Sequence, residues 1–331
     1  MSWYSVLARR RRVARWGGLT LTVAASVLGG AGAVAGSAAA AVTVPPDASG
    51  NYAFQTLNND RDPTFNQLLG INNSGLISGY FGSGMAGHPN KGYLLSKNYH
   101  QGNYHNENFP GSAQTQVTGL NNGGVSVGFW VDKHGNNHGF YFSQKRYHSV
   151  NFPTNNNAKP QVDQLLGVND NNLAVGFYTD KHGVNHGYSY NIRSHRFRSI
   201  TVSGDSNLTA AAINGFNDVA GFATNSSGAT EAFLLRSDGR LFRLSFPGGT
   251  STQALGVNDG DEVVGDYTVG SGNTATMHGF IWGPGFGFET VNAPKGTDTT
   301  TINGVNDRGT LVGFYVDSAG NTDGLLAKAR G

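Results

Sequence analysis

The sequence predicts an all-β fold, a six-bladed β-propeller of four-stranded blades, and three observations lead to it. One unit recurs six times at intervals of 44 to 49 residues, and a complete unit contains four short segments with alternating apolar residues. The last unit lacks its fourth segment, and a matching segment precedes the first unit. A fixed period of this length is typical of solenoids and propellers.

Residues 1–41 differ in composition from the rest of the chain and are predicted to be a signal peptide. Four consecutive arginines, Arg9 to Arg12, precede an apolar run of Gly and Ala that ends in small residues near Ser37 to Ala41. This order is typical of a cleaved export signal. A membrane anchor needs about 20 strongly apolar residues, so we expect a secreted protein without a membrane segment. The paired arginines leave the general secretory and twin-arginine routes both open.

Loss of this leader changes the charge of the protein. It contains five of the 23 Lys and Arg residues, and no Asp or Glu precedes Asp47, so residues 42–331 carry 18 basic against 21 acidic side chains. Without a basic stripe, a nucleic-acid partner is not expected. The absence of cysteine excludes disulfides and thiolate metal sites. Residues 42–331 are therefore expected to form a single, monomeric domain that is stabilised by its packed core.

An aliphatic–Asn pair marks each repeat. The anchors are Asn72, Asn121, Asn169, Asn214, Asn258 and Asn306. In the third unit the first strand is expected at 164–169 (QLLGVN), the second at 173–180 (LAVGFYTD) and the third at 186–191 (HGYSYN). Fourth strands follow an aromatic-x-x-aliphatic pattern that ends before Pro, as at 147–153. Alternating Val, Ile, Phe and Tyr favour half-buried strands, and no segment after residue 42 shows a helical period.

The ends of the chain indicate how the ring closes. The sixth unit stops after its third strand at 324–331 (GLLAKARG), whereas residues 54–58 (FQTLN) match the fourth strand at 288–292 (FETVN). We therefore expect an N-terminal strand to complete the last blade. A linear solenoid is the structural alternative, but it would need atypical capping units and would not explain the displaced strand.

The recurrent pattern GINDxGxxVGxYxDxxGxxHGF, clearest in units two, three and six, resembles the bacterial extracellular repeats of the HAF family. The resemblance covers residues 52–329 and lies in the repeat pattern alone. It implies secretion and a repeat fold, and it assigns no activity. Unit four departs most, because it reads AINGFND and its third strand begins with Glu231-Ala232 in place of His-Gly.

Two recurrent positions are interpreted as structural. Short amides before a tight turn commonly cap that turn, so the anchor asparagines are expected to act as caps. Two residues before each anchor stands a small residue, which indicates close backbone approach near the axis. These small residues are Gly70, Gly119, Gly167, Ala212, Gly256 and Gly304.

The segment DKHGNNHGF at 132–140 returns as DKHGVNHGY at 180–188. In a hairpin, Asp132 would face His138 and Asp180 would face His186, either as a staple between strands or as an acid–base or metal site. Other units place different residues at these positions: Asn225 and Glu231, Val269 and His278, and Asp317 and Asp323. The staple is therefore favoured, and neither a metal nor a cofactor is predicted.

A ring of polar residues is the candidate ligand site. Five residues before each anchor stand Gln67, Gln116, Gln164, Thr209, Gln253 and Thr301. Their amides and hydroxyls would suit a polyhydroxyl ligand at a channel mouth, or they could be satisfied by water and neighbouring backbone. Aromatic residues at the end of second strands could strengthen a carbohydrate site or pack between blades. These are Trp130, Tyr178, Tyr267 and Tyr315.

Three classes of function are compatible with these features. The leading hypothesis is a secreted binding module for an extracellular polysaccharide, a cell-wall component or a protein. The second is a lyase or hydrolase, with or without a divalent ion, that uses Asp132, His138, Asp180 and His186. A passive structural envelope protein is the third. No Gly-x-Ser-x-Gly, His-Glu-x-x-His or phosphate-loop motif is present to support a particular chemistry.

Overall fold

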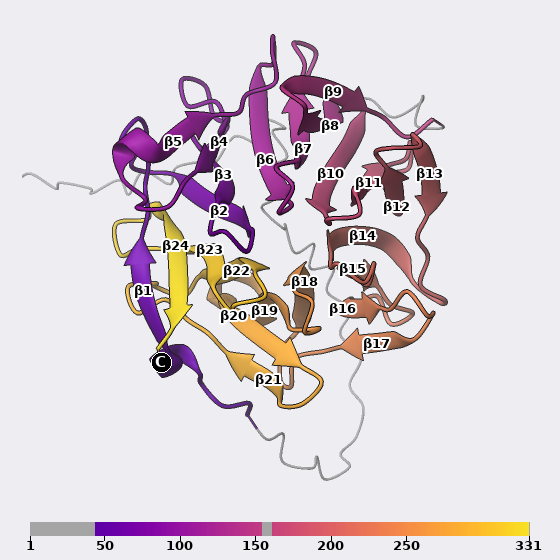
Figure 1. Ribbon diagram of the computed structural model, residues 1–331. Helices are drawn as coiled ribbons and strands as arrows, with labels where there is room; N and C mark the ends of the chain where they lie inside the picture. Colours follow the sequence, from indigo (N-terminus) through magenta and orange to yellow (C-terminus); the bar gives the residue numbers. More distant parts are fainter. Residues whose placement is uncertain (1–43, 154–160, 331) are drawn as a thin grey trace, which may run out of the picture.

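The structure, a computed structural model, describes residues 44–153 and 161–330, so the predicted signal peptide lies outside the described residues. In these ranges 24 strands form six four-stranded antiparallel sheets that surround a central axis (Figure 1). The predicted six-bladed β-propeller is confirmed. Over the same ranges, no helix has the length and hydropathy that crossing a bilayer requires.

Each repeat supplies one blade, with its first strand innermost. The innermost strands are β2 (Asn66–Ile71), β6 (Gln114–Leu120), β10 (Val162–Val168), β14 (Ser206–Ile213), β18 (Ser251–Val257) and β22 (Thr300–Val305). The second strands are β3 (Ile77–Phe81), β7 (Ser126–Val131), β11 (Leu173–Thr179), β15 (Val219–Thr224), β19 (Val263–Val269) and β23 (Leu311–Val316). Blades are numbered one to six in this order.

The outermost strand of each blade is its shortest, and its residues are mostly exposed or half-buried. The third strands are β4 (Lys91–Leu95), β8 (Asn137–Ser143), β12 (Asn185–Asn191), β16 (Thr230–Leu235), β20 (Thr276–Gly283) and β24 (Thr322–Ala329). The outermost strands are β5 (Tyr104–Asn106), β9 (Arg146–Val150), β13 (Arg196–Ser199), β17 (Leu241–Leu244), β21 (Gly287–Thr290) and β1 (Tyr52–Thr56). Three short 3-10 helices complete the fold: η1 (Ser49–Asn51), η2 (Gln101–Asn103) and η3 (Gly272–Thr274).

Blade six is built from both ends of the described chain. Strand β1 pairs antiparallel with β24, from Tyr52 opposite Ala329 to Thr56 opposite Leu325 (Figure 1). The N-terminal strand therefore supplies the outermost strand of a sheet whose other three strands are the last in the sequence. This pairing joins the two chain ends and covers the edge that β24 would otherwise expose.

Small residues allow the innermost strands to approach one another. A Cβ added at Gly119 would lie 2.8 Å from the carbonyl oxygen of Leu166 and 3.2 Å from the Cα of Gly167, in the next blade. Equivalent crowding occurs at Gly70 and Gly304. The crowding expected near the axis is thus confirmed, and larger side chains would push the blades apart.

The hydrophobic core lies between neighbouring sheets. One cluster, for example, joins Val127 and Tyr141 of blade two to Leu165 and Tyr188 of blade three. Alternation along each strand sends one set of side chains to each face, and each face packs against an adjacent blade. A blade therefore has no complete core of its own and depends on its neighbours.

The anchor asparagines form a closed ring of hydrogen bonds around the axis. Each side-chain oxygen accepts backbone N–H groups of its own turn; Asn72 Oδ1, for instance, binds the amides of Ser74 and Leu76 at 3.0 Å. Each side-chain nitrogen donates to the carbonyl of the next anchor, and all six of these bonds measure 2.9–3.3 Å. The predicted turn caps are confirmed, and the same amides also connect every blade to the next.

We expect Asn121→Ala to destabilise the protein by about 2–4 kcal/mol, because it leaves the buried N–H of Val125 without a partner and removes the hydrogen bond that joins this blade to the carbonyl of Asn169. Urea unfolding measures this loss. The control is Asn122→Ala in the same turn, whose exposed side chain should contribute less than about 1 kcal/mol. Equal losses in both variants would show that the ring does not contribute specially to stability.

Candidate functional site

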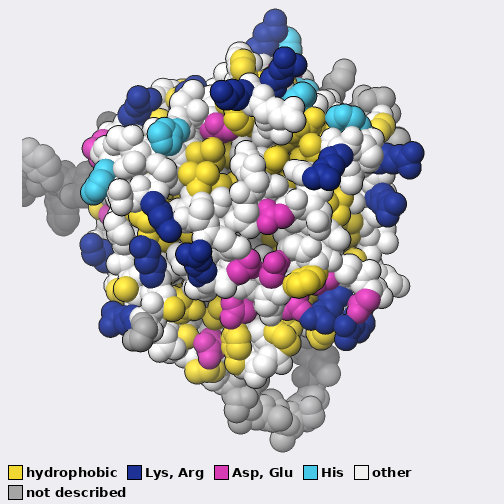
Figure 2. All heavy atoms as spheres, in the orientation of Figure 1, with side chains coloured by type: hydrophobic (Ala, Val, Ile, Leu, Met, Phe, Trp, Pro, Cys, Tyr) yellow, Lys and Arg dark blue, Asp and Glu magenta, His cyan; other side chains and the backbone are white. Residues whose placement is uncertain are grey.

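One end of the axis is lined by the turns that follow the anchors. The residues after the anchors surround a depression of about 100 Å³, and Figure 2 shows acidic side chains close to the centre of this face. The carboxylates of Asp170, Asp259 and Asp307 each accept a backbone N–H from the preceding blade. In the described part of the chain, no three His, Cys, Asp or Glu side chains are grouped so that they could hold a metal ion.

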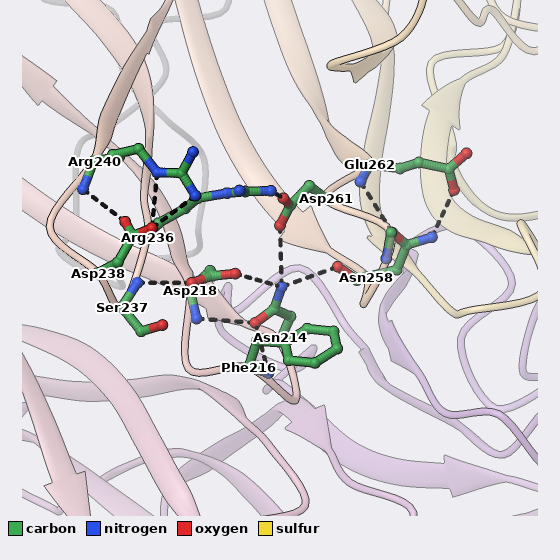
Figure 3. A network of polar contacts seen from close by, with 11 residues as sticks. Asn214, Phe216, Asp218, Arg236, Ser237, Asp238, Arg240, Asn258, Asp261 and Glu262 are labelled. Carbon is green, nitrogen blue, oxygen red and sulfur yellow. Dashed lines mark hydrogen bonds and ion pairs between the residues drawn. The ribbon is translucent and has the colours of Figure 1, made fainter.

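The junction of blades four and five shows how these acidic side chains are used. The amide nitrogen of Asn214 lies 3.3 Å from the carbonyl of Asn258 and from carboxylate oxygens of Asp218 and Asp261 (Figure 3). Arg236 forms an ion pair with Asp261. Asp261 therefore joins blades four and five, whereas Asp218 binds groups of its own blade.

The predicted polar ring lies inside the protein. All six residues are on the innermost strands, and at most 3% of each is exposed. Several bind the start of the third strand in the preceding blade: Gln116 Nε2 donates to Asn90 Oδ1 at 2.9 Å, and Gln164 Nε2 to Asn137 Oδ1 at 3.3 Å. The expectation that these side chains crowd an open channel mouth is therefore not met. Gln67, Thr209 and Thr301 also have partners within the fold.

Blade five introduces a buried carboxyl group next to this ring. Asp266 stands directly opposite Gln253 on the neighbouring strand, where four other blades place Phe129, Phe177, Phe222 and Phe314. Neither Asp266 Oδ1 nor Gln253 Oε1 has a hydrogen-bond partner among the described residues. Burial raises the pKa of Asp266 to about 7. The repeat alignment shows from the sequence that Asp266 replaces an aromatic residue. The cost of placing a carboxyl group at this position follows only from its burial.

The two Asp–His pairs have the geometry of hairpin staples. Asp132 Oδ2 lies 3.4 Å from His138 Nε2, and Asp180 Oδ2 lies 2.9 Å from His186 Nε2. The other oxygen of Asp180 binds the backbone amides of His182 and Val184. The hydrogen bond from His186, followed by those from the backbone, lowers the pKa of Asp180 to about 2. Asn225 and Asp317 bind their own turns in the same way.

The predicted aromatic residues belong to packed cups. In blade two a cup formed by Trp130, Phe140 and Tyr147 receives Phe109, which stacks on Trp130 at a centroid distance of 4.4 Å. Phe152 fills the cup that contains Tyr178, and Phe246 stacks on Tyr267 at 3.5 Å. Tyr267 and Tyr315 are 6% and 2% exposed. These side chains therefore do not form a ring of exposed platforms.

Blade one has the same cup but no phenylalanine to fill it. Its walls are Phe81, Tyr93 and Tyr104, with Tyr93 in edge contact with Tyr104 at 4.8 Å. By the repeat, the filling position falls at Asn59, which follows β1. Asn59 Oδ1 instead accepts the backbone N–H of Arg61. A pocket of about 530 Å³, lined by these four residues, lies at this place.

Polar groups surround the aromatic walls of this pocket, which we call the blade-one pocket. Its lining also includes Asp60, Arg61, Lys91, His105 and Asn108. The hydroxyl of Tyr104 is buried and has no hydrogen-bond partner among the described residues. Burial, with a smaller contribution from Asp60, raises the pKa of Tyr104. The hydroxyl therefore stays protonated and can donate a hydrogen bond. Sequence reasoning missed this pocket, although Asn59 in place of Phe was a readable signal.

We expect the stability gained by Asp266→Asn to grow by about 2 kcal/mol between pH 5 and pH 8. Asp266 has a pKa of about 7 when folded, whereas an unfolded Asp titrates near about 3.9. The unfolded state thus loses its proton at lower pH, and the free energy of unfolding of the wild type falls as pH rises between these values. Urea unfolding at both pH values measures the difference.

Asp317→Asn is the matched control. Hydrogen bonds from the backbone and side chain of Asn321 lower the pKa of Asp317, so this group is ionised in both states between pH 5 and pH 8 and its contribution does not change there. An Asp266→Asn gain that is the same at both pH values would contradict burial of a titrating carboxyl group.

Comparisons with known proteins identify the fold. No family model and no curated protein matches this chain, so the resemblance to HAF repeats stays a prediction. A solved structure of a putative TolB from Agrobacterium tumefaciens aligns with a TM-score of 0.54 at 11% identity, covering 85% of this chain and 99% of that one. The SapL1 lectin in complex with alpha methyl fucoside aligns with a TM-score of 0.50 at 10% identity, covering 81% and 93%. At such identities the likeness establishes the propeller fold alone.

Proposed function

We propose that this protein is a secreted binding module that holds a saccharide in the blade-one pocket. The observation that carries the proposal is the unfilled aromatic cup. In blades two, three and five a phenylalanine occupies the cup, whereas in blade one Asn59 leaves Phe81, Tyr93 and Tyr104 facing a cavity.

The chemistry of the pocket suits a sugar. A pyranose has apolar C–H faces that pack on aromatic rings and hydroxyls that both donate and accept hydrogen bonds. The cup offers the aromatic rings, and the unpartnered hydroxyl of Tyr104 offers a polar contact beside them. Asp60 and Asn108 add further polar side chains to the lining.

The size and rigidity of the pocket also support a small ligand. Its volume of about 530 Å³ lies within the range of about 300–1,000 Å³ that is typical of ligand sites. Two loops are joined across it, because the backbone amide of Asp60 donates to Gln101 Oε1 at 3.0 Å and Gln101 Nε2 donates to the carbonyl of Asn58 at 2.7 Å. The walls are thus formed in advance of binding.

The fold is compatible with this function. SapL1, a lectin with the same propeller architecture, is seen in complex with alpha methyl fucoside. Propellers also serve unrelated functions, so the fold alone does not assign a ligand. The buried Gln and Thr ring offers little surface to a polysaccharide, and the blade-one pocket replaces it in this proposal.

We expect Asn59→Phe to abolish saccharide binding without loss of stability, because the new side chain fills the cup as Phe109, Phe152 and Phe246 do. Retention on immobilised bacterial and plant polysaccharides measures binding, and thermal unfolding measures stability. A folded Asn59→Phe protein that still binds as the wild type does would contradict the pocket as the site.

The hydroxyl of Tyr104 provides a second test. Tyr104→Phe should weaken binding about threefold to tenfold, since a hydrogen bond contributes about 1 kcal/mol. Tyr147→Phe is the matched control, because Tyr147 occupies the same position in the filled cup of blade two and should leave binding unchanged. If the two variants weaken saccharide binding equally, the assignment of Tyr104 to the site is wrong.

A further inference from the structure

We infer that the blade-one pocket selects a saccharide that carries a negatively charged group, with Lys91 as its counter-ion and Arg61 as a second cation. This inference rests on the proposed function and narrows it to one class of ligand.

Lys91 occupies a position that the other blades keep paired. It stands opposite Phe81 across β3 and β4, as His138 stands opposite Trp130 and His186 opposite Tyr178. His138 and His186 bind Asp132 and Asp180 of their own turns. The equivalents in the other three blades are also paired: Glu231 with Arg243, His278 with Asn292, and Asp323 with Asn58.

Blade one has lost the acid that would pair with this position. The repeat places Ser83 where blades two and three have Asp132 and Asp180. Among the described residues, the ammonium group of Lys91 has neither an ion pair nor a hydrogen bond. The copied staple therefore lacks its carboxylate in a blade whose cup also holds no phenylalanine, and Lys91 lines the pocket there.

Arg61 adds a second cation from the loop that follows β1. It lines the same pocket, and its guanidinium group likewise has no partner among the described residues. Asp60 is the one carboxylate in the lining, and it lies close enough to Tyr104 to raise the pKa of that hydroxyl. With Arg61 and Lys91 against Asp60, the lining is positively charged overall, whereas residues 42–331 carry a net negative charge.

This arrangement favours an acidic sugar over a neutral one. A carboxylate or sulfate on the ligand would replace the acid that the repeat has lost, and a planar guanidinium can bind such a group with two hydrogen bonds. Asp60 and the hydroxyl of Tyr104 remain available for sugar hydroxyls. Lys91 is half-buried, which strengthens its attraction for an anion, whereas Arg61 is exposed.

The experiment compares chemically matched ligands. Affinities of the purified protein are measured for alginate, polygalacturonate and hyaluronan oligosaccharides, each beside its carboxyl-reduced, neutral form, and for dextran sulfate beside dextran. We expect the charged member of at least one pair to bind about tenfold more tightly, and this preference to shrink as salt rises from about 50 mM to about 500 mM. The carboxylate and sulfate pairs distinguish the two sources of negative charge.

Two charge-removing variants connect the preference to the pocket. Lys91→Gln and Arg61→Gln should each weaken binding of the charged ligand about fivefold more than binding of its neutral form. Lys145→Gln, which removes an exposed cation from the β8–β9 turn of blade two, is the control and should change neither affinity.

The possible outcomes separate the inference from the proposed function. Equal binding of charged and reduced ligands that is abolished by Asn59→Phe overturns the inference and leaves the saccharide site in place. Charge-dependent binding that Asn59→Phe does not weaken shows a general attraction of anions to the surface and also overturns the inference. Charge-dependent binding that Lys145→Gln weakens as much as Lys91→Gln does leads to the same conclusion. If no saccharide binds, or if Asn59→Phe weakens the binding of none, both proposals fail.

Discussion

The hydrogen-bond ring of anchor asparagines is the constraint on which the propeller depends. One amide side chain closes its own turn through the oxygen and joins the next blade through the nitrogen, as Asn169 does toward Asn214. No shorter polar side chain supplies both an acceptor and a donor at that reach. Because all six bonds lie at the axis, the blades share one centre, and the small residues beside the anchors allow the strands to meet there.

Repetition determines where the rest of the chain is buried. Each blade covers the next, so the Gln and Thr residues copied on the innermost strands are buried in every blade. Gln116 and Gln164 bind the preceding blade, whereas burial of Asp266 raises its pKa. Their polarity marks contacts between blades, since the copies of one position never converge on a single ligand.

Departures from the repeat are where a binding site can arise. Blade one is built beside the joint between the two ends of the chain, and there Asn59 replaces the stacking phenylalanine while Ser83 replaces the stapling aspartate. Either change alone would leave a small defect. Together they leave an aromatic pocket whose lining includes Lys91, which has no ion pair with any residue that the structure describes.

The sequence alone determined the number of blades, the four strands of each, the caps at the anchors and the displaced first strand, because period, alternation and turn residues act locally and recur six times. It also identified the Asp132–His138 pair as neighbours across a hairpin. Tertiary structure decided exposure. The sequence shows that Gln116 is polar and Tyr315 aromatic, but whether these side chains face solvent depends on how adjacent blades pack. The pocket at Asn59 likewise exists only because two distant segments of the chain meet there.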